Sequence, residues 1–104
     1  MIKQLLIVGS LAMAASLVQA TPDEAMGKAG CTACHTKDKK VVGPAFKDIA
    51  AKYKGDKEAV AKLTEKVRKG GSGVWGPIPM PPNPAEKIAD ADLKAVIEQI
   101  LKTQ

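Results

Sequence analysis

Apolar residues recur three and four positions apart in the second half of the chain, which is the spacing of one face of an α-helix. The clearest such face lies near the carboxyl terminus and consists of Leu93, Val96, Ile97, Ile100 and Leu101. Asp90 precedes this face and is a candidate helix cap. A shorter face of the same spacing consists of Val60, Leu63 and Val67. We expect Asp56 to cap that helix and the pair Gly70-Gly71 to end it.

Two further helices are predicted closer to the amino terminus. Residues 21–24 are typical of a helix start, because Thr21 can cap, proline fits the first turn and Glu24 completes a capping box. We expect this helix to run towards Cys31. Another helix is predicted after the turn at residues 43–44 by the spacing of Phe46, Ile49, Ala50 and Tyr53. No stretch alternates like a β-strand, so the sequence predicts an all-α fold with about four helices.

The first twenty residues have the pattern of a secretory signal peptide. Lys3 gives a positive start, residues 5–18 are mostly apolar, and Ala20 ends a small-residue cleavage site. The apolar stretch is shorter than the roughly 18 residues that a membrane-spanning helix usually needs. We therefore expect cleavage after Ala20, export to the periplasm without a membrane anchor, and one mature domain at residues 21–104.

The segment between the last two predicted helices differs in composition from the rest of the chain. Residues 76–84 hold five of the seven prolines, and Met80 lies among them. Each proline fixes its own φ angle and pushes the preceding residue towards an extended conformation. We therefore expect a rigid loop without a helix, in which Met80 is held in a defined position.

Both cysteines and the only histidine of the chain lie within five residues, Cys31-Thr32-Ala33-Cys34-His35. Two thiols at this spacing can each add to a vinyl group of one porphyrin, and a histidine directly after them can bind the iron through a neutral ring nitrogen. This run is the attachment motif of c-type haem. We therefore predict one covalent haem c bound through Cys31 and Cys34, with His35 as an axial ligand.

A dithiol centre, a zinc site and a disulfide would each use only part of this motif. A dithiol redox centre is expected in a βαβ context, which the helical pattern does not provide. A structural zinc site normally needs four Cys or His ligands, and the motif has three. A disulfide would use the two cysteines and leave the adjacent His35 as a coincidence.

Met80 is the predicted second axial ligand. The chain has four methionines, of which two leave with the signal peptide, and Met26 lies on the helix that leads into the haem motif. The alternative is that Met80 only fills space, as methionine often does. With His and Met both on the iron, the potential is raised and no site is open to a substrate. This combination predicts an electron carrier; a small peroxidase or a gas-binding haem protein would need Met80 off the iron.

Three segments together resemble the small bacterial class I cytochromes c of the c-551/c-552 type. They are the haem motif, Val42-Gly43-Pro44-Ala45-Phe46, and the stretch Gly73-Val74-Trp75-Gly76-Pro77-Ile78-Pro79-Met80-Pro81-Pro82-Asn83. The resemblance covers essentially all of residues 21–104. It implies the class I cytochrome c fold, in which about four helices wrap around one covalently attached haem.

The resemblance also implies roles for four further residues. The Pro44 carbonyl would accept the other ring N–H of His35 and so orient the imidazole. Arg68 and Trp75 would donate hydrogen bonds to a haem propionate, and Asn83 would steer the Met80 sulfur. The alternatives are an exposed helix charge at Arg68, a core tryptophan at Trp75 and a turn residue at Asn83.

The charge of the chain bears on its partners. Every charged residue except Lys3 lies in residues 21–104, which therefore carry a formal net charge of +4, one less than the +5 of the whole chain. Lys37, Lys39 and Lys40 directly follow the haem motif. Such a patch would steer docking on acidic redox proteins, although a merely solvated basic face accounts for any single lysine equally well. We expect a monomer that exchanges electrons with periplasmic or membrane redox proteins and has no nucleic-acid partner.

Overall fold

The computed structural model describes residues 21–104, and the predicted signal peptide lies outside the described residues. Within this range the chain forms four α-helices, one short 3-10 helix and two isolated β-bridges, and no longer strand. The elements are α1 (Pro22–Ala29), η1 (Cys31–Ala33), α2 (Phe46–Lys52), α3 (Ala59–Lys69) and α4 (Asp90–Leu101). The predicted all-α fold is confirmed. None of the helices in this part of the chain has the length and apolar character needed to cross a membrane.

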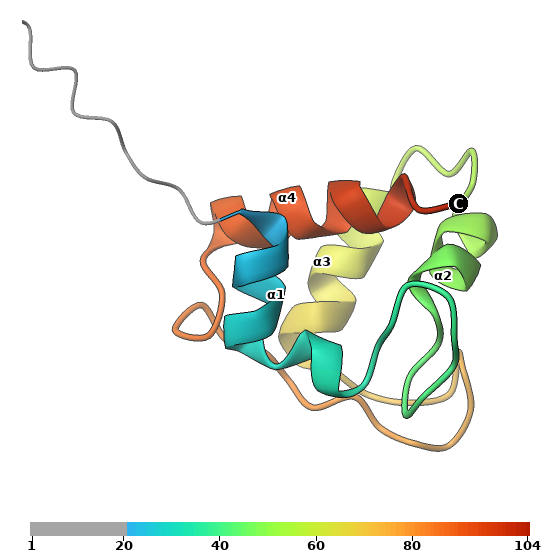
Figure 1. The fold of residues 1–104 in the computed structure, drawn as a ribbon, viewed down its shortest axis with the longest axis horizontal. Coiled ribbons are helices and arrows are strands. Elements are labelled where there is room, and N and C mark those ends of the chain that lie inside the picture. The colour runs from blue at the N-terminus through green and yellow to red at the C-terminus, as the bar shows by residue number, and fades with distance from the viewer. Residues whose placement is uncertain (1–20) are drawn as a thin grey trace, which may run out of the picture.

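Helix α4 is the element against which the others pack. It contacts α1, α2 and α3, and in Figure 1 it runs across the top of the fold with α1 and α3 descending from it. The apolar face predicted for this helix supplies the core: Leu93, Val96 and Ile97 are buried, while Ile100 and Leu101 are partly buried against the same cluster. The other buried members of the cluster are Ala25, Met26, Ala29, Phe46, Ile49 and Ile88.

Of the three predicted helix caps, Thr21 is confirmed, and Asp56 and Asp90 are wrong. Thr21 caps α1 as expected, since its hydroxyl oxygen accepts a hydrogen bond from the Glu24 amide at 3.3 Å. Asp56 does not cap α3: its carboxylate accepts from the Glu58 amide at 2.9 Å and closes a turn, and the helix begins after that turn. Asp90 is the first residue of α4 and not its cap, because its carboxylate is paired with Arg68.

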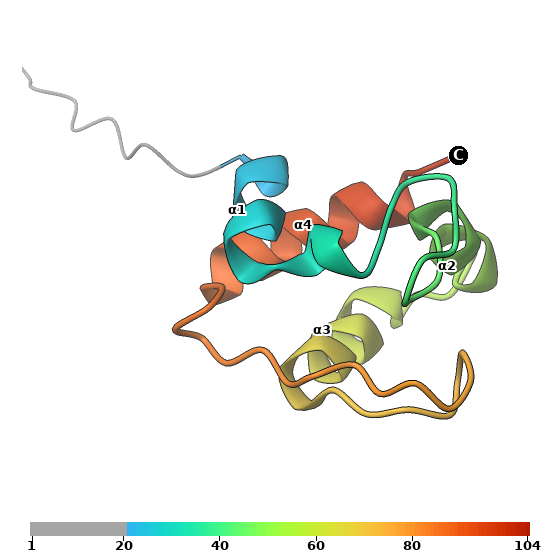
Figure 2. The same ribbon diagram turned by 60° about the horizontal axis from the view of Figure 1, so that its bottom comes forward.

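Residues 70–89 connect α3 to α4 without forming a helix, as the prolines predicted. Figure 2 shows this segment leaving the end of α3, turning back on itself and running past α3 to the start of α4. The turn is closed by two backbone hydrogen bonds of 2.9 Å between Gly71 and Met80, one in each direction. Met80 is thereby placed next to the carboxyl-terminal end of α3.

Candidate functional site

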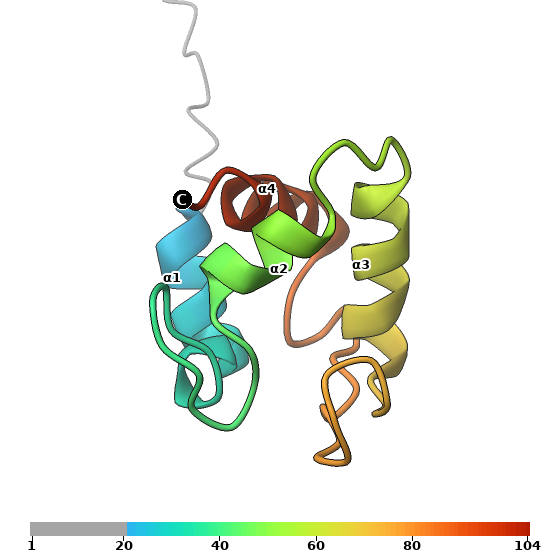
Figure 3. The ribbon, with the colours of Figure 1, turned by 90° about the vertical axis from the view of Figure 1, so that its right-hand side faces the viewer.

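A cavity of about 320 Å³ lies between the segment that carries the cysteines and the proline-rich loop. Figure 3 shows the two sides: α1 and the segment that follows it on the left, α3 and the loop on the right, with α2 and α4 between them above. The walls bring together six of the predicted site residues, namely Cys31, Cys34, His35, Pro44, Trp75 and Met80. Much of the remaining wall is apolar and includes Phe46, Ile49, Leu63, Val67, Leu93 and Ile97.

The chemistry of this cavity fits a covalently bound haem. Both cysteines are free thiols at its wall, so a disulfide does not account for them. Burial raises the pKa of the Cys31 thiol, which keeps it protonated, whereas a reactive dithiol centre depends on a stabilised thiolate. Residues 21–104 bring together no group of three or more His, Cys, Asp or Glu side chains suited to hold a metal ion by themselves. Two thiols, an imidazole and a thioether around an apolar space are the groups that a haem c requires.

The His35 ring is fixed by its near neighbours in the chain. Its Nδ1 lies 2.8 Å from the Pro44 carbonyl oxygen. Because a carbonyl can only accept, Nδ1–H donates, and the lone pair of Nε2 is left available for iron. The Phe46 ring stacks on the imidazole, with centroids 5.6 Å apart and planes inclined by 19°. The expected hydrogen bond between His35 and Pro44 is therefore present.

Gly43 also helps to position the His35 ring, a role that was not predicted from the sequence. A Cβ atom at this position would lie 2.4 Å from Cε1 of His35, which is closer than real contacts allow. The Gly43 amide also donates to the Cys34 carbonyl at 2.7 Å, so the backbone folds directly across the imidazole. The absence of a side chain at Gly43 is thus what admits the His35 ring.

Met80 reaches the cavity from the opposite segment, held through its backbone. Its amide and carbonyl both pair with Gly71, as described above. Gly70 permits this approach, since its φ of 68° disfavours other residues and a Cβ there would lie 2.3 Å from the Met80 carbonyl oxygen. The loop can lie this close to α3 only because the helix ends in glycine.

Asn83 has other partners than the one expected. The residue is only 5% exposed, and its side-chain Nδ2 donates to the carbonyls of Pro81 at 3.0 Å and Val67 at 3.3 Å. Its backbone amide also donates to Val67, at 3.0 Å. Because both side-chain partners are carbonyl acceptors, the amide nitrogen is directed at them and not at the Met80 sulfur. Asn83 therefore fastens the loop to α3.

Arg68 differs from its expected role as a propionate donor. It is not among the residues that line the cavity, and its guanidinium bonds to Asn83, Ile88 and Asp90. The cations of α3 that do line the cavity are Lys62, which is paired with Asp56, and Lys66; neither was predicted as a site residue from the sequence. Positions two apart on a helix lie on nearly opposite sides, so Lys66 and Arg68 cannot share one face. The sequence signal for Lys66 was its spacing from Leu63, because residues three positions apart on a helix lie on the same face.

Trp75 lines the cavity and is 39% exposed, so it is not a core residue. The Lys52 ammonium lies 5.7 Å from the centroid of its ring. Other large apolar side chains that line the cavity are also exposed, namely Val42, Val74 and Ile78. Lys37, Lys39 and Lys40 are exposed as well. At the cavity itself, the exposed apolar side chains lie together with the basic residues Lys62 and Lys66, which line it, and Lys52 at Trp75.

Sequence comparison agrees with this site. Residues 23–104 match the family described as Cytochrome c. The chain belongs to the cytochrome c family. It is 52% identical over 84 residues to cytochrome c2 of Rubrivivax gelatinosus, a match that covers 81% of this chain and 99% of the relative. It is 50% identical over 98 residues to cytochrome c-552 of Nitrosomonas europaea, covering 90% of this chain and 92% of that one.

Structural comparison leads to the same family. The crystal structure of Nitrosomonas europaea cytochrome c552 superposes with a TM-score of 0.73 at 49% sequence identity, and covers 79% of this chain and 99% of that one. The predicted resemblance to cytochromes c-551/c-552 is therefore confirmed, as are the fold and the covalent haem c expected at Cys31 and Cys34. The chain is an electron carrier of this family and not an enzyme.

Proposed function

We propose that this cytochrome is a one-electron shuttle of the periplasm whose haem iron is bound by His35 and Met80. The observation that carries the proposal is that both side chains line the same apolar cavity as the two thiols, from two different segments of the chain. Haem c, when bound, supplies an iron atom that takes up and releases one electron. The export signal predicted at residues 1–20 supports the compartment.

The protein's part in electron transfer is to hold two ligands still. The Pro44 carbonyl keeps Nδ1 of His35 protonated and Nε2 free. The paired backbone of Gly71 and Met80 keeps the thioether at the cavity wall. A thioether is a weak ligand for ferric iron, so its bond depends on a loop that has little conformational entropy to gain on release. With both axial positions filled by the chain, no substrate has an open site.

Lys66 and Trp75 are the residues we assign to the haem propionates. Both line the cavity, and both carry N–H groups that can donate to a carboxylate. Lys66 replaces Arg68 in this role, because the Arg68 guanidinium is already engaged elsewhere. A lysine supplies one compact charge, whereas the indole supplies a single directed donor.

The surface around the cavity mouth is the docking region that we propose for redox partners. Exposed Trp75, Val74 and Ile78 offer apolar contact there. The net positive charge of residues 21–104 favours partners with acidic surfaces, and association should slow as salt screens this attraction. We expect the shuttle to act as a monomer.

The substitution Met80→Ala tests the proposed ligation. It should lower the reduction potential by on the order of 0.2 V, a fraction of the roughly 0.8 V range that axial ligands span, and should let imidazole or cyanide bind the ferric protein. Potentiometric titration and ligand-binding spectra measure both effects. Met26→Leu is the matched control, because Met26 is buried in the helical core and away from the cavity wall. A Met80→Ala protein with an unchanged potential would show that the sixth ligand is another group.

A further inference from the structure

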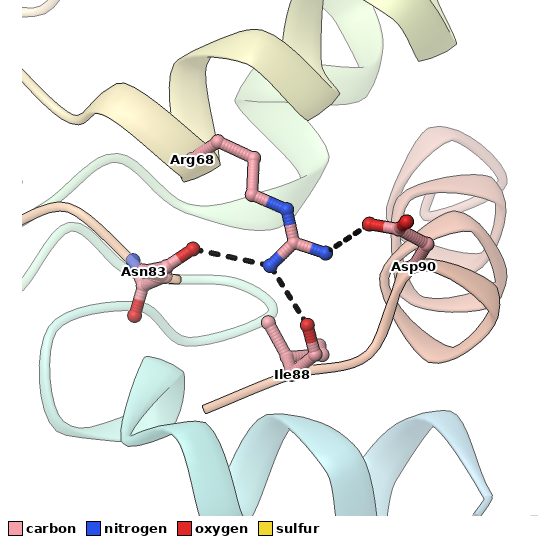
Figure 4. Close-up of polar contacts among 4 residues, drawn as sticks. All are labelled: Arg68, Asn83, Ile88 and Asp90. Atoms are coloured by element: carbon pink, nitrogen blue, oxygen red, sulfur yellow. Dashed lines mark hydrogen bonds and ion pairs between the residues drawn. The ribbon is translucent and has the colours of Figure 1, made fainter. Parts of the chain in front are cut away.

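One guanidinium joins three separate segments of the chain. Nη1 of Arg68 donates to the carbonyl oxygens of Asn83 at 3.1 Å and Ile88 at 2.7 Å, and Nη2 donates to the Asp90 carboxylate at 2.5 Å. Figure 4 shows the side chain extending from the end of α3 into the space between the loop and the start of α4. The three partners lie 15, 20 and 22 residues away along the chain.

The first of these partners closely follows the proposed iron ligand. Residues 80–84 read Met-Pro-Pro-Asn-Pro, so only Met80 and Asn83 have backbone N–H groups to offer. Both are already used, on the carbonyls of Gly71 and Val67. Any further hydrogen bond to the backbone of this segment must therefore be accepted by one of its carbonyl groups. Arg68 provides such a bond at Asn83.

Two adjacent residues of α3, Val67 and Arg68, form hydrogen bonds with Asn83. The Val67 carbonyl accepts from both the backbone and the side-chain amide of Asn83, while Arg68 donates to its carbonyl. The Arg68 side chain is only 21% exposed, so its bonds to the two carbonyls are partly shielded from water. Asp90 is 92% exposed, and an ion pair at such a position contributes little. The two carbonyl contacts are therefore the important ones.

We propose that Arg68 is a positioning residue for Met80, which holds the segment after this ligand against α3 and α4 and so limits the release of the thioether from the iron. The proposal rests on the function proposed above, in which Met80 binds the haem iron. Hydrogen bonds from a charged donor are stronger than neutral ones. Their loss would leave the loop anchored by its neutral backbone bonds and by the Asn83 amide.

The test is Arg68→Ala in the haem-loaded protein, with imidazole as the competing ligand. Imidazole can bind ferric iron only when Met80 has left, so its affinity reports how readily the loop opens. We expect imidazole affinity to rise roughly tenfold, as loss of a hydrogen bond from a charged group implies. The pH at which the far-red sulfur-to-iron charge-transfer band disappears should fall as well. Arg68→Lys should lie between, because an ammonium lacks the planar fork that spans both carbonyls.

Two control variants separate positioning from charge and from general stability. Lys69→Ala removes the same charge from the same helical turn, but Lys69 is paired only with exposed Glu65, so imidazole affinity should stay unchanged. Ala50→Gly weakens α2 at a buried position that does not line the cavity, and should lower the unfolding midpoint without changing imidazole affinity.

The outcomes are distinct. Arg68→Ala with wild-type imidazole affinity, or with an effect that Ala50→Gly reproduces at equal loss of stability, overturns the positioning role. A wild-type protein that lacks the charge-transfer band overturns the assignment of Met80 and this proposal with it. A wild-type band together with a selective effect of Arg68→Ala supports both.

Discussion

The two sides of the cavity are built in different ways. The His35 side is held by residues that follow it closely, with the Pro44 carbonyl nine positions away and the Phe46 ring just beyond. The Met80 side has one pairing of the same span, between Gly71 and Met80, but it is also held across longer separations, such as the 16 residues between Asn83 and Val67. The contacts of the first side are available from one short segment. Those of the second require α3, the loop and α4 to be in place together.

This difference determines which side of the cavity opens first when the protein is destabilised. Contacts between distant segments cost more chain entropy to form, and they are lost when any of their elements loosens. The loop also lacks regular helix hydrogen bonds of its own. We therefore expect the Met80 side to open before the His35 side under denaturant, heat or high pH.

The largest effect on folding is expected when haem, the group that both sides enclose, is not attached. In the double variant Cys31→Ala, Cys34→Ala, haem is not attached, and the cavity stays unfilled or collapses. The cavity of about 320 Å³ would then lack the apolar group that fills it, and a domain of this size has little other core to offset that loss. Far-ultraviolet circular dichroism should show that most of the helix signal is lost. A variant that keeps its helices without haem would contradict this expectation.

A pair of glycine substitutions distinguishes the two sides directly. Gly70→Ala forces a left-handed φ on a residue with a Cβ and pushes against the Met80 carbonyl, so about 1–3 kcal/mol of stability should be lost. Its imidazole affinity should rise, because the loop is displaced. Gly43→Ala pushes instead on the His35 ring and is the matched control. Equal imidazole affinities in the two variants would show that the sides are not independent.

The difference between the two sides also decides which parts of the site could be predicted from the sequence. The hydrogen bond between His35 and Pro44 and the helix faces depend on near neighbours, and these predictions agree with the structure. Arg68 and Asn83 depend on which side of α3 meets the loop, and a shift of two positions along a helix reverses that side. Asp56 and Asp90 resembled caps because acidic residues favour helix starts, but a local turn and Arg68 engage their carboxylates.

The smallest effect is expected at the turn before α3, where Asp56 does not itself line the cavity. The Lys62 ammonium and the Glu58 amide both bond to Asp56 and hold the pKa of that carboxyl below its ordinary value. A lowered pKa stabilises the fold above the ordinary pKa, and this stabilisation is lost as pH falls through the folded value. Asp56→Asn should therefore be slightly less stable than wild type at neutral pH, and this difference should vanish in acid.

Urea unfolding of Asp56→Asn and wild type across the acid range measures this difference. Asp56 is partly exposed and its partner Lys62 is exposed, so the effect should be small, and the coordination of the iron should not change. A difference that persisted unchanged below the folded pKa would point to a cause other than the carboxylate charge.

The most direct test of the proposed ligand pair is the visible spectrum of the oxidised wild-type protein, expressed as the full chain with haem maturation machinery. Coordination by His35 and Met80 predicts a weak far-red band of sulfur-to-ferric-iron charge transfer, absent from Met80→Ala and retained in Met26→Leu. A haem spectrum without that band in the wild type would contradict the proposed ligand pair and with it the closed iron site.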